Sequence, residues 1–225
     1  GLSKGLWNRH LLTGSEIKNK KIGIIGLGKI GREVMNRCNS FGMKVLGYDP
    51  FVNSDIFDKN QIKILSFNSI IKEVDYLTIH IPMTKNTKGL FNYTVFKKMK
   101  STARIINVAR GGIIDEKDLA KALNKKLILG AAIDVFEKEP IESKNHLLNA
   151  KNILLTPHLG ASTYEAKEGV SLSICRQICD YLKENKLTNA LNIPISNFSK
   201  NKGLKYLLEL SELLGSLISQ IKDGP

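Results

Sequence analysis

Short apolar runs alternate with segments of helical periodicity over about residues 20–160 of the chain. Six of these runs are rich in Ile, Val and Leu and show little alternation between polar and apolar positions. Such runs are typical of strands that are buried on both faces of a parallel sheet. The pattern therefore predicts an α/β fold with a doubly wound parallel sheet, whose strands span residues 21–25, 44–48, 76–81, 104–108, 128–133 and 153–156.

The segments between these strands carry apolar residues at helical spacing. They predict helices over residues 30–39, 69–74, 93–100 and 116–123. Asp115 precedes the last of these segments and Asp118 lies in its first turn, where acidic side chains cap a helix and favour its dipole. Because such helices connect parallel strands, we expect them to cover both faces of the sheet.

The pattern changes after residue 160, where long amphipathic segments replace the alternation. Residues 162–165, Ser-Thr-Tyr-Glu, form a capping box that predicts a helix over about residues 163–185. Its apolar stripe recurs every four residues, at Val170, Ile174, Ile178 and Leu182.

A second long helix is predicted over residues 204–221, after a connecting segment at 187–199. Its apolar face has no obvious partner in the chain and consists of Leu207, Leu208, Leu210, Leu214, Leu217 and Ile218.

The composition is that of an ordinary water-soluble protein, with 42% hydrophobic and 24% charged residues among 225. No apolar run approaches the roughly 18 residues of a transmembrane helix, so we expect no membrane partner. The net charge of +13 comes from scattered lysines rather than an arginine-rich or aromatic-interleaved stripe. We therefore predict a solvated basic surface and no nucleic-acid partner.

Three cysteines form no CxxC pair, and their odd number argues against a disulfide framework. Cys175 and Cys179 can share a helix face, but no nearby His completes a metal set, so no metal is predicted. These features favour a reducing, cytoplasmic location. The chain begins at Gly1 in mid-pattern, and we expect it to be a fragment whose N-terminus, with any targeting signal, is missing.

A glycine fingerprint, GLGKIG at residues 26–31, follows the first predicted strand directly and opens a helix. Gly26 permits a tight turn, Gly28 lets the backbone approach a pyrophosphate, and Gly31 lets the helix pack closely on the strand. Asp49 ends the second strand 18 residues later, where a carboxylate accepts ribose hydroxyls and repels a 2′-phosphate. The motif predicts NAD binding in preference to NADP. The alternative is that Asp49 only starts a turn with the proline after it.

Further candidate residues follow the other strands of the predicted sheet. Because ligands of open α/β sheets bind beyond the carboxyl ends of the strands, these residues are expected at one edge. They are Pro82 after the third strand, Arg110 after the fourth, Asp134 after the fifth and His158 after the sixth.

Arg110, Glu139 and His158 together have the chemistry of an alcohol–ketone redox site. Arginine can hold a substrate carboxylate through two parallel hydrogen bonds. Histidine can take the hydroxyl proton near neutral pH, and a glutamate beside it fixes its tautomer and favours its protonated form. Two alternatives stay open: Arg110 as a surface ion-pair partner, and Glu137 as the carboxylate in place of Glu139.

The other three histidines, His10, His80 and His146, are predicted to be structural.

Four segments resemble the D-isomer-specific 2-hydroxyacid dehydrogenase family, at residues 26–32, 107–115, 134–140 and 157–163. Motifs within residues 7–16, 41–43, 47–50 and 189–194 resemble the branch of that family that acts on 3-phosphoglycerate. The resemblance covers about residues 5–195.

The resemblance implies a Rossmann-type domain with NAD as cofactor and a homodimer formed through that domain. It assigns catalytic roles to Arg110, Glu139 and His158, with a small-molecule substrate, 3-phosphoglycerate, that is oxidised to 3-phosphohydroxypyruvate in the first step of serine biosynthesis. It also implies a cofactor site that includes the three fingerprint glycines. The other residues of that site are Lys29, Ile30, Asp49, Ile81, Pro82, Val108, Asp134, His158 and Ala161.

Family members carry about a hundred residues of substrate domain before this region, which the chain largely lacks. We therefore expect an NAD-binding domain with flanking interdomain helices over residues 1–186, and a connecting segment with the start of a truncated further domain over 187–225. The fragment alone is expected to bind NAD with little or no turnover. Alternatives are a dehydrogenase for glyoxylate, hydroxypyruvate or another 2-hydroxy acid, and a corepressor-like module that senses NAD(H).

Overall fold

The computed structural model describes residues 3, 5, 7, 13–53, 56–190 and 202–222. The chain divides into two compact units, Gly1–Gly160 and Ala161–Pro225, and each is described by itself. The predicted domain boundary after residue 186 concerns the whole protein and stays a prediction.

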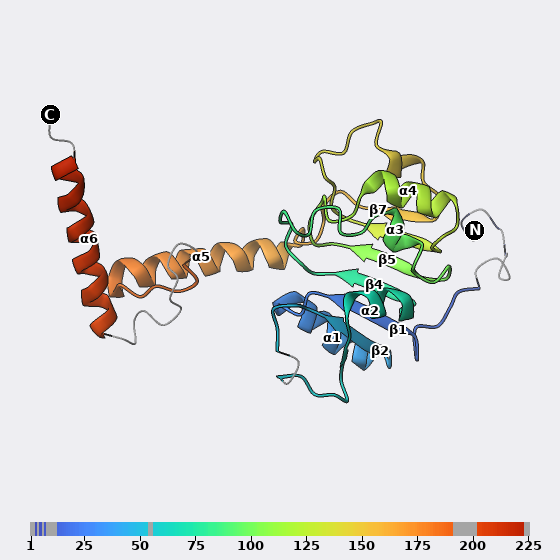
Figure 1. Cartoon of the computed structure of the whole chain (residues 1–225), viewed down its shortest axis with the longest axis horizontal. Helices are drawn as coiled ribbons and strands as arrows, with labels where there is room; N and C mark the ends of the chain where they lie inside the picture. The colour runs from blue at the N-terminus through green and yellow to red at the C-terminus, as the bar shows by residue number, and fades with distance from the viewer. Residues whose placement is uncertain are drawn as a thin grey trace. The chain divides into compact units, whose positions relative to one another are not determined.

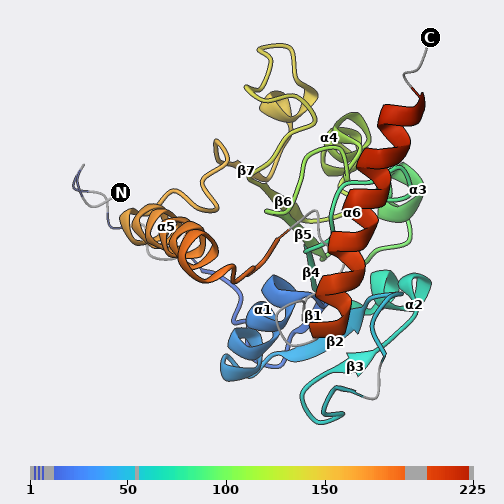
Figure 2. The same ribbon diagram turned by 90° about the vertical axis from the view of Figure 1, so that its left-hand side faces the viewer.

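The first unit is built on a seven-stranded parallel sheet with the strand order β3-β2-β1-β4-β5-β6-β7 (Figure 1 and Figure 2). The register aligns the carboxyl ends of the central strands, because Ile25 pairs with both Tyr48 and Ile79, and Asn107 pairs with Ile79 and Ile133. The strands are β1 (Lys21–Ile25), β2 (Lys44–Tyr48), β3 (Lys63–Ile64), β4 (Tyr76–Ile79), β5 (Arg104–Asn107), β6 (Gly130–Ile133) and β7 (Ile153–Leu155).

Helices lie on both sides of this sheet, which confirms the doubly wound α/β prediction (Figure 2). One face carries α2 (Phe67–Glu73), α3 (Tyr93–Phe96) and α4 (Glu116–Asn124), and it forms a large buried core that includes Ile70, Phe96 and Leu119. The opposite face carries α1 (Lys29–Ser40), which packs with Ile22 and Ile24 of β1 in a smaller core.

Some element boundaries differ from the predictions for local reasons. Helix α2 begins at Phe67 rather than residue 69, because the Ser66 side chain caps it by accepting the Ser69 amide. Strand β4 ends at Ile79, two residues early, although the His80 amide still donates to the Ile25 carbonyl over 2.7 Å. Two short elements were not predicted, β3 and the 3₁₀ helix η4 (His146–Asn149), because neither is long enough to show a periodicity.

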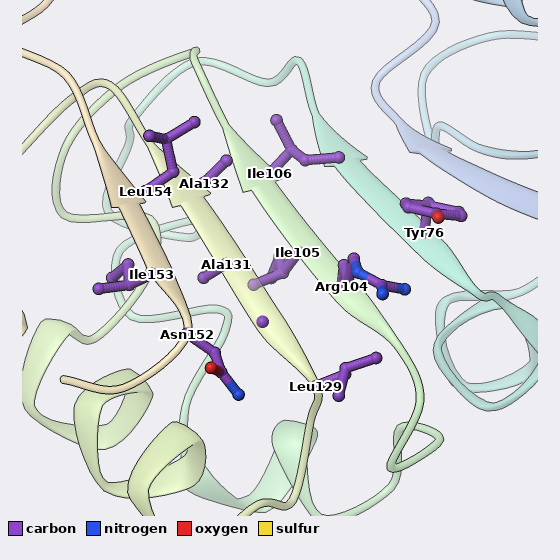
Figure 3. A pocket seen from close by; sticks show the side chains of 11 residues that line it. Tyr76, Arg104, Ile105, Ile106, Leu129, Ala131, Ala132, Asn152, Ile153 and Leu154 are labelled. Atoms are coloured by element: carbon purple, nitrogen blue, oxygen red, sulfur yellow. The ribbon is translucent and has the colours of Figure 1, made fainter. Parts of the chain in front are cut away.

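Within the first unit, the expectation that the strands are buried on both faces is wrong for β5–β7, on the face opposite α3 and α4. Leu154 of β7 is 64% exposed, and a hollow of about 600 Å³ lies over Ile106, Ala132 and Leu154 on the face away from the helices (Figure 3). The connections β4–β5, β5–β6 and β6–β7 all step in one direction across the sheet. Since such crossovers are right-handed, α2, α3 and α4 fall on the same face. The opposite face carries α1 over β1, and no described helix of the first unit covers it over β5, β6 and β7. We call this uncovered surface the open face.

The second unit contains two long helices, α5 (Tyr164–Glu184) and α6 (Lys202–Lys222). Thr163 caps α5 by accepting the Ala166 amide, so the cap is one residue later than the predicted capping box that starts at Ser162. The predicted stripe of α5 is exposed, from 50% at Ile174 to 75% at Leu182. In α6 the side chains of Leu207, Leu210, Leu214, Leu217 and Ile218 are also exposed, whereas the Leu208 side chain and most of the predicted connecting segment lie outside the described residues.

No helix among the described residues combines the length and apolar content needed to cross a membrane.

Candidate active site

The glycine loop lies at the carboxyl end of β1, and two of its glycines are required by the fold. A Cβ at Gly26, where φ is +95°, would lie 2.5 Å from the His80 carbonyl oxygen. A Cβ at Gly31 would lie 2.0 Å from the Gly26 carbonyl oxygen. At Gly28, by contrast, a Cβ would meet no atom within 4 Å. The protein itself therefore leaves space beside Gly28, at the amino end of α1, which is where a dinucleotide phosphate binds in this type of loop.

Asp49 ends β2 and holds the glycine loop through its carboxylate. Its Oδ2 accepts the Leu27 amide over 2.8 Å and its Oδ1 accepts the Phe51 amide over 2.9 Å. The alternative that Asp49 starts a turn is thus partly right, because its side chain accepts a hydrogen bond from the amide of the residue two positions later. Each carboxylate oxygen still has capacity for a second donor, such as a ribose hydroxyl.

Arg32 also fixes the same loop. Its Nε donates to the Leu27 carbonyl over 2.9 Å, and its guanidinium lies 5.1 Å from the Phe57 ring centre. Sequence reasoning missed this residue, because an arginine after the last glycine belongs to no short motif with a stated mechanism.

Arg110 lies on a tight turn after β5, and Asn107 forms that turn. The Asn107 side chain accepts the Ala109 amide and donates to the Arg110 carbonyl, both over 3.0 Å. The Arg110 side chain is exposed and donates to the Ala109 carbonyl over 2.7 Å. Among the described residues no hydrogen bond joins it to Glu139 or His158, so its guanidinium remains accessible to an anion.

The next residue brings this turn against the loop that carries Glu139. A Cβ at Gly111 would lie 1.8 Å from the Phe136 carbonyl oxygen, so the two backbones are in direct contact. The Phe136 amide in turn donates to Glu139 Oε1 over 2.9 Å. The turn of Arg110 and the carboxylate of Glu139 are therefore linked through the backbone of one residue, Phe136.

Glu139 and His158 form a hydrogen-bonded pair. Glu139 Oε2 lies 2.7 Å from His158 Nδ1, with the side chains 36% and 49% exposed. The hydrogen bond from His158 is the main cause that lowers the pKa of Glu139, followed by the one from the Phe136 amide. Since Nδ1 faces the carboxylate, the other ring nitrogen, Nε2, is left for a substrate. Glu137 instead pairs with Lys88 over 3.1 Å, so of the two carboxylates Glu139 is the one that contacts His158.

Asp134 lies beneath His158 and holds it in place. It is only 4% exposed, and its carboxylate accepts hydrogen bonds from Thr156 Oγ1 and from the amides of Leu159 and Gly160. Its own carbonyl accepts the His158 amide over 2.9 Å, where His158 adopts a left-handed φ of 54°. Burial acts to raise the pKa of Asp134, but the three hydrogen bonds and the nearby His158 outweigh it and hold that pKa below its ordinary value.

The remaining predicted cofactor residues fall on the same edge or outside the first unit. Lys29 and Ile30 open α1, Val108 is exposed after β5, and Pro82 follows β4. The Ile81 side chain lies against Gly26. Ala161 begins the second unit and is not placed relative to the others.

Of the histidines that were predicted to be structural, His80 is partly buried and its Nε2 lies 3.0 Å from Thr78 Oγ1. Burial lowers the pKa of His80. His146 begins η4, and His10 lies outside the described residues. In the part of the chain that the structure describes, no group of three or more His, Cys, Asp or Glu side chains is arranged to hold a metal ion.

The family model of the D-isomer specific 2-hydroxyacid dehydrogenase NAD binding domain matches residues 1–160. The D-3-phosphoglycerate dehydrogenase of Synechocystis sp. is 41% identical over 218 residues, which are 97% of this chain and 39% of that protein. The chain thus spans about two-fifths of the length of such curated relatives.

Solved structures of related enzymes share the fold. A glyoxylate reductase from Paecilomyes thermophila superimposes with a TM-score of 0.74 at 28% identity, covering 85% of this chain and 58% of that one. The NAD-complexed D-isomer specific 2-hydroxyacid dehydrogenase from Lactobacillus delbrueckii ssp. bulgaricus gives a TM-score of 0.72 at 26% identity, covering 83% and 60%. With its glycine loop, its sheet order and this family match, the chain belongs to the D-isomer specific 2-hydroxyacid dehydrogenases, as their NAD-binding domain.

Proposed function

We propose that this chain is the NAD-binding and proton-transfer part of an enzyme that oxidises 3-phosphoglycerate to 3-phosphohydroxypyruvate, the first step of serine biosynthesis. The observation that carries the proposal is the 2.7 Å contact between Glu139 Oε2 and His158 Nδ1, on the same sheet edge as the glycine loop. The relatives named D-3-phosphoglycerate dehydrogenase, such as the Synechocystis protein at 41% identity, support the choice of substrate.

NAD, when bound, supplies the acceptor for the hydride that leaves the carbinol carbon. His158 takes the hydroxyl proton on Nε2, so that the C–O bond becomes a carbonyl. Glu139 keeps Nδ1 protonated and stabilises the imidazolium that results. Arg110 binds the substrate carboxylate through its exposed guanidinium, next to the carbon that is oxidised.

The cofactor site of this proposal is the glycine loop with its neighbours. Gly28 and the first residues of α1, Lys29 and Ile30, meet the pyrophosphate, and Asp49 binds the ribose hydroxyls. Ile81, Pro82, Val108, Asp134 and Ala161 line the rest of the site by analogy with the family. The structure adds one refinement: the Asp134 carboxylate already accepts three hydrogen bonds from the His158 loop, so we assign it first to holding that loop.

The decisive test is turnover of the full-length protein with NAD and 3-phosphoglycerate, compared with unphosphorylated 2-hydroxy acids. We expect the phosphorylated substrate to be preferred, and His158→Gln to lower kcat by about 10²–10⁴-fold, the usual contribution of a general acid or base. His146→Gln serves as the matched control and should retain full activity. Preference for glycolate or glycerate would favour the glyoxylate or hydroxypyruvate alternative.

A second measurement separates an enzyme from a sensor. Calorimetric titration of this chain should detect NAD binding. An activity assay on the same chain should find little turnover. If the full-length protein also binds NAD(H) but oxidises no 2-hydroxy acid, the corepressor-like alternative is favoured.

A homodimer through the NAD-binding unit is also part of the proposal, as is a cytoplasmic location. Analytical ultracentrifugation of the full-length protein should find a dimer.

A further inference from the structure

One carboxylate outside the predicted site ties down the loop that carries Glu139. Glu116 is the first residue of α4, and its Oε1 accepts the Glu137 amide over 2.7 Å. Its Oε2 accepts the Asn145 side-chain amide over 2.5 Å. The two donors lie at either end of residues 137–145, which we call the Glu139 loop. A single side chain thus closes this loop at both ends.

The far end of the loop is anchored in turn. Asn145 Oδ1 accepts the Leu147 amide and so caps η4, and Leu147 is completely buried. At the near end, the Phe136 amide donates a hydrogen bond to Glu139 Oε1. The Phe136 carbonyl is in contact with Gly111 of the Arg110 turn. Glu116 therefore connects the base of α4 with both segments that flank Glu139.

Besides the bonds of Glu116 and Glu139, the loop has one backbone hydrogen bond among the described residues, and its remaining interactions are weaker. That bond runs from the Asn145 amide to the Glu142 carbonyl over 2.9 Å. A hollow of about 460 Å³ lies beside it, lined by Glu116, Glu137 and Asn145 among others, so the loop does not rest on a solid core there. Its ion pairs, Lys88 with Glu137 and Lys138 with Glu142, are exposed, and such pairs contribute little. Hydrogen bonds to a carboxylate, such as those that Glu116 accepts, are stronger than those between neutral groups. Ile141 adds some apolar packing of the loop against the core.

We propose that Glu116 is a positioning residue for the Glu139–His158 pair: it holds the Glu139 loop at the place where Glu139 Oε2 meets His158 Nδ1. The expected effect of Glu116 on kcat rests on the proposed function. The expected effect of Glu116 on the position of the Glu139 loop does not. The opposing possibility is that Glu116 merely stabilises the fold.

The low pKa of Glu139 gives a readout that a purely stabilising role would not change. Its main cause is the hydrogen bond from His158, with nearby Asp134 acting in the opposite direction. If the loop loses its anchor, that hydrogen bond weakens and the pKa of Glu139 rises toward the ordinary value of about 4.3.

The experiment compares three variants of this chain by ¹³C NMR titration of the Glu139 side-chain carboxyl. Glu116→Ala should raise the pKa of Glu139, and Glu116→Gln should raise it less, because a glutamine oxygen can still accept the Glu137 amide. Asp118→Ala is the matched control: Asp118 lies on the same turn of α4 and accepts the Tyr93 amide over 2.9 Å, away from the loop. It should lower the unfolding midpoint and leave the pKa of Glu139 unchanged.

In the full-length enzyme, Glu116→Ala should lower kcat by about 10–100-fold, as small misplacements of catalytic groups do, while the KM for NAD stays unchanged. Glu116→Gln should recover most of that loss. The proposal is overturned if neither Glu116 variant shifts the pKa of Glu139, or if Asp118→Ala shifts it equally. Absence of any turnover in the wild-type enzyme would contradict the proposed function instead, and the titration would still decide the role of Glu116.

Discussion

The two halves of the candidate site are built in different ways. The glycine loop is a continuous stretch of six residues, fixed by Asp49 and by close backbone contacts around Gly26 and Gly31. The Glu139–His158 half is assembled from segments that follow β5, β6 and β7, and several of its hydrogen bonds join residues 19 to 29 positions apart. The cofactor half therefore depends mainly on the backbone shape of one continuous segment, whereas the proton-transfer half depends on a polar network between loops.

The largest expected effect comes from one glycine in each half. Gly31→Ala would place a Cβ 2.0 Å from a backbone oxygen, and Gly111→Ala would place one at 1.8 Å. Since a backbone atom must shift to relieve each contact, we expect each variant to lose about 4 kcal/mol or more of unfolding free energy. Urea unfolding followed by circular dichroism measures this loss.

Gly169→Ala is the control for these two variants. Gly169 lies inside α5, and a Cβ there would meet no atom within 4 Å, so alanine should be neutral or slightly stabilising. If Gly31→Ala or Gly111→Ala unfolded at the same urea concentration as the wild type, the close contacts that define both halves would be wrong.

The second prediction breaks only the proton-transfer half. Asp134→Asn keeps the size of the side chain but presents an NH₂ group to the Leu159 or Gly160 amide, both of which need an acceptor. We expect a loss of about 2–3 kcal/mol at neutral pH, with the glycine loop intact.

This loss has a defined pH dependence. Because the folded-state pKa of Asp134 is lowered, its carboxylate contributes stability above the unfolded pKa of about 3.9 and loses that contribution as the pH falls through the folded pKa. The difference between wild type and Asp134→Asn should therefore be largest near neutral pH and shrink below about pH 4. A constant difference between pH 7 and pH 3 would contradict the charge-based role.

The sequence predicts the two halves unequally well. The fingerprint, the six longer strands and the residues Arg110, Glu139 and His158 are recognisable because periodicity and motif spacing are local properties. Thr156 and Glu116 are not recognisable, because each acts through a partner that only the folded sheet brings near. The open face was mispredicted for a similar reason: an apolar strand indicates burial, but the direction of the crossovers decides which face the helices cover.

The third prediction isolates the cofactor half without disturbing the fold. Gly28→Ala adds a methyl group to open space, at a residue whose φ of −69° suits alanine. The unfolding free energy should stay unchanged, while the affinity for NAD falls by about 10–100-fold because the methyl group keeps the pyrophosphate from the backbone. Calorimetric titration of the chain with NAD tests this. Unaltered affinity would mean that the dinucleotide does not approach Gly28.

The smallest effect is expected at the opposite edge of the sheet, which belongs to neither half. Lys21 and Glu73 form an ion pair there over 2.8 Å, and the hydrogen bond from Lys21 is the main cause that lowers the pKa of Glu73. Both side chains are more than one-third exposed, so solvent screens the pair, and Glu73→Gln should cost less than about 1 kcal/mol. Any cost should vanish as the pH falls through the lowered pKa of Glu73, since the wild-type carboxylate is then neutral too. The same variant should leave both the NAD affinity and the pKa of Glu139 unchanged. A change in either would mean that the two halves respond to the sheet as a whole, and that the division between local and assembled parts is too sharp.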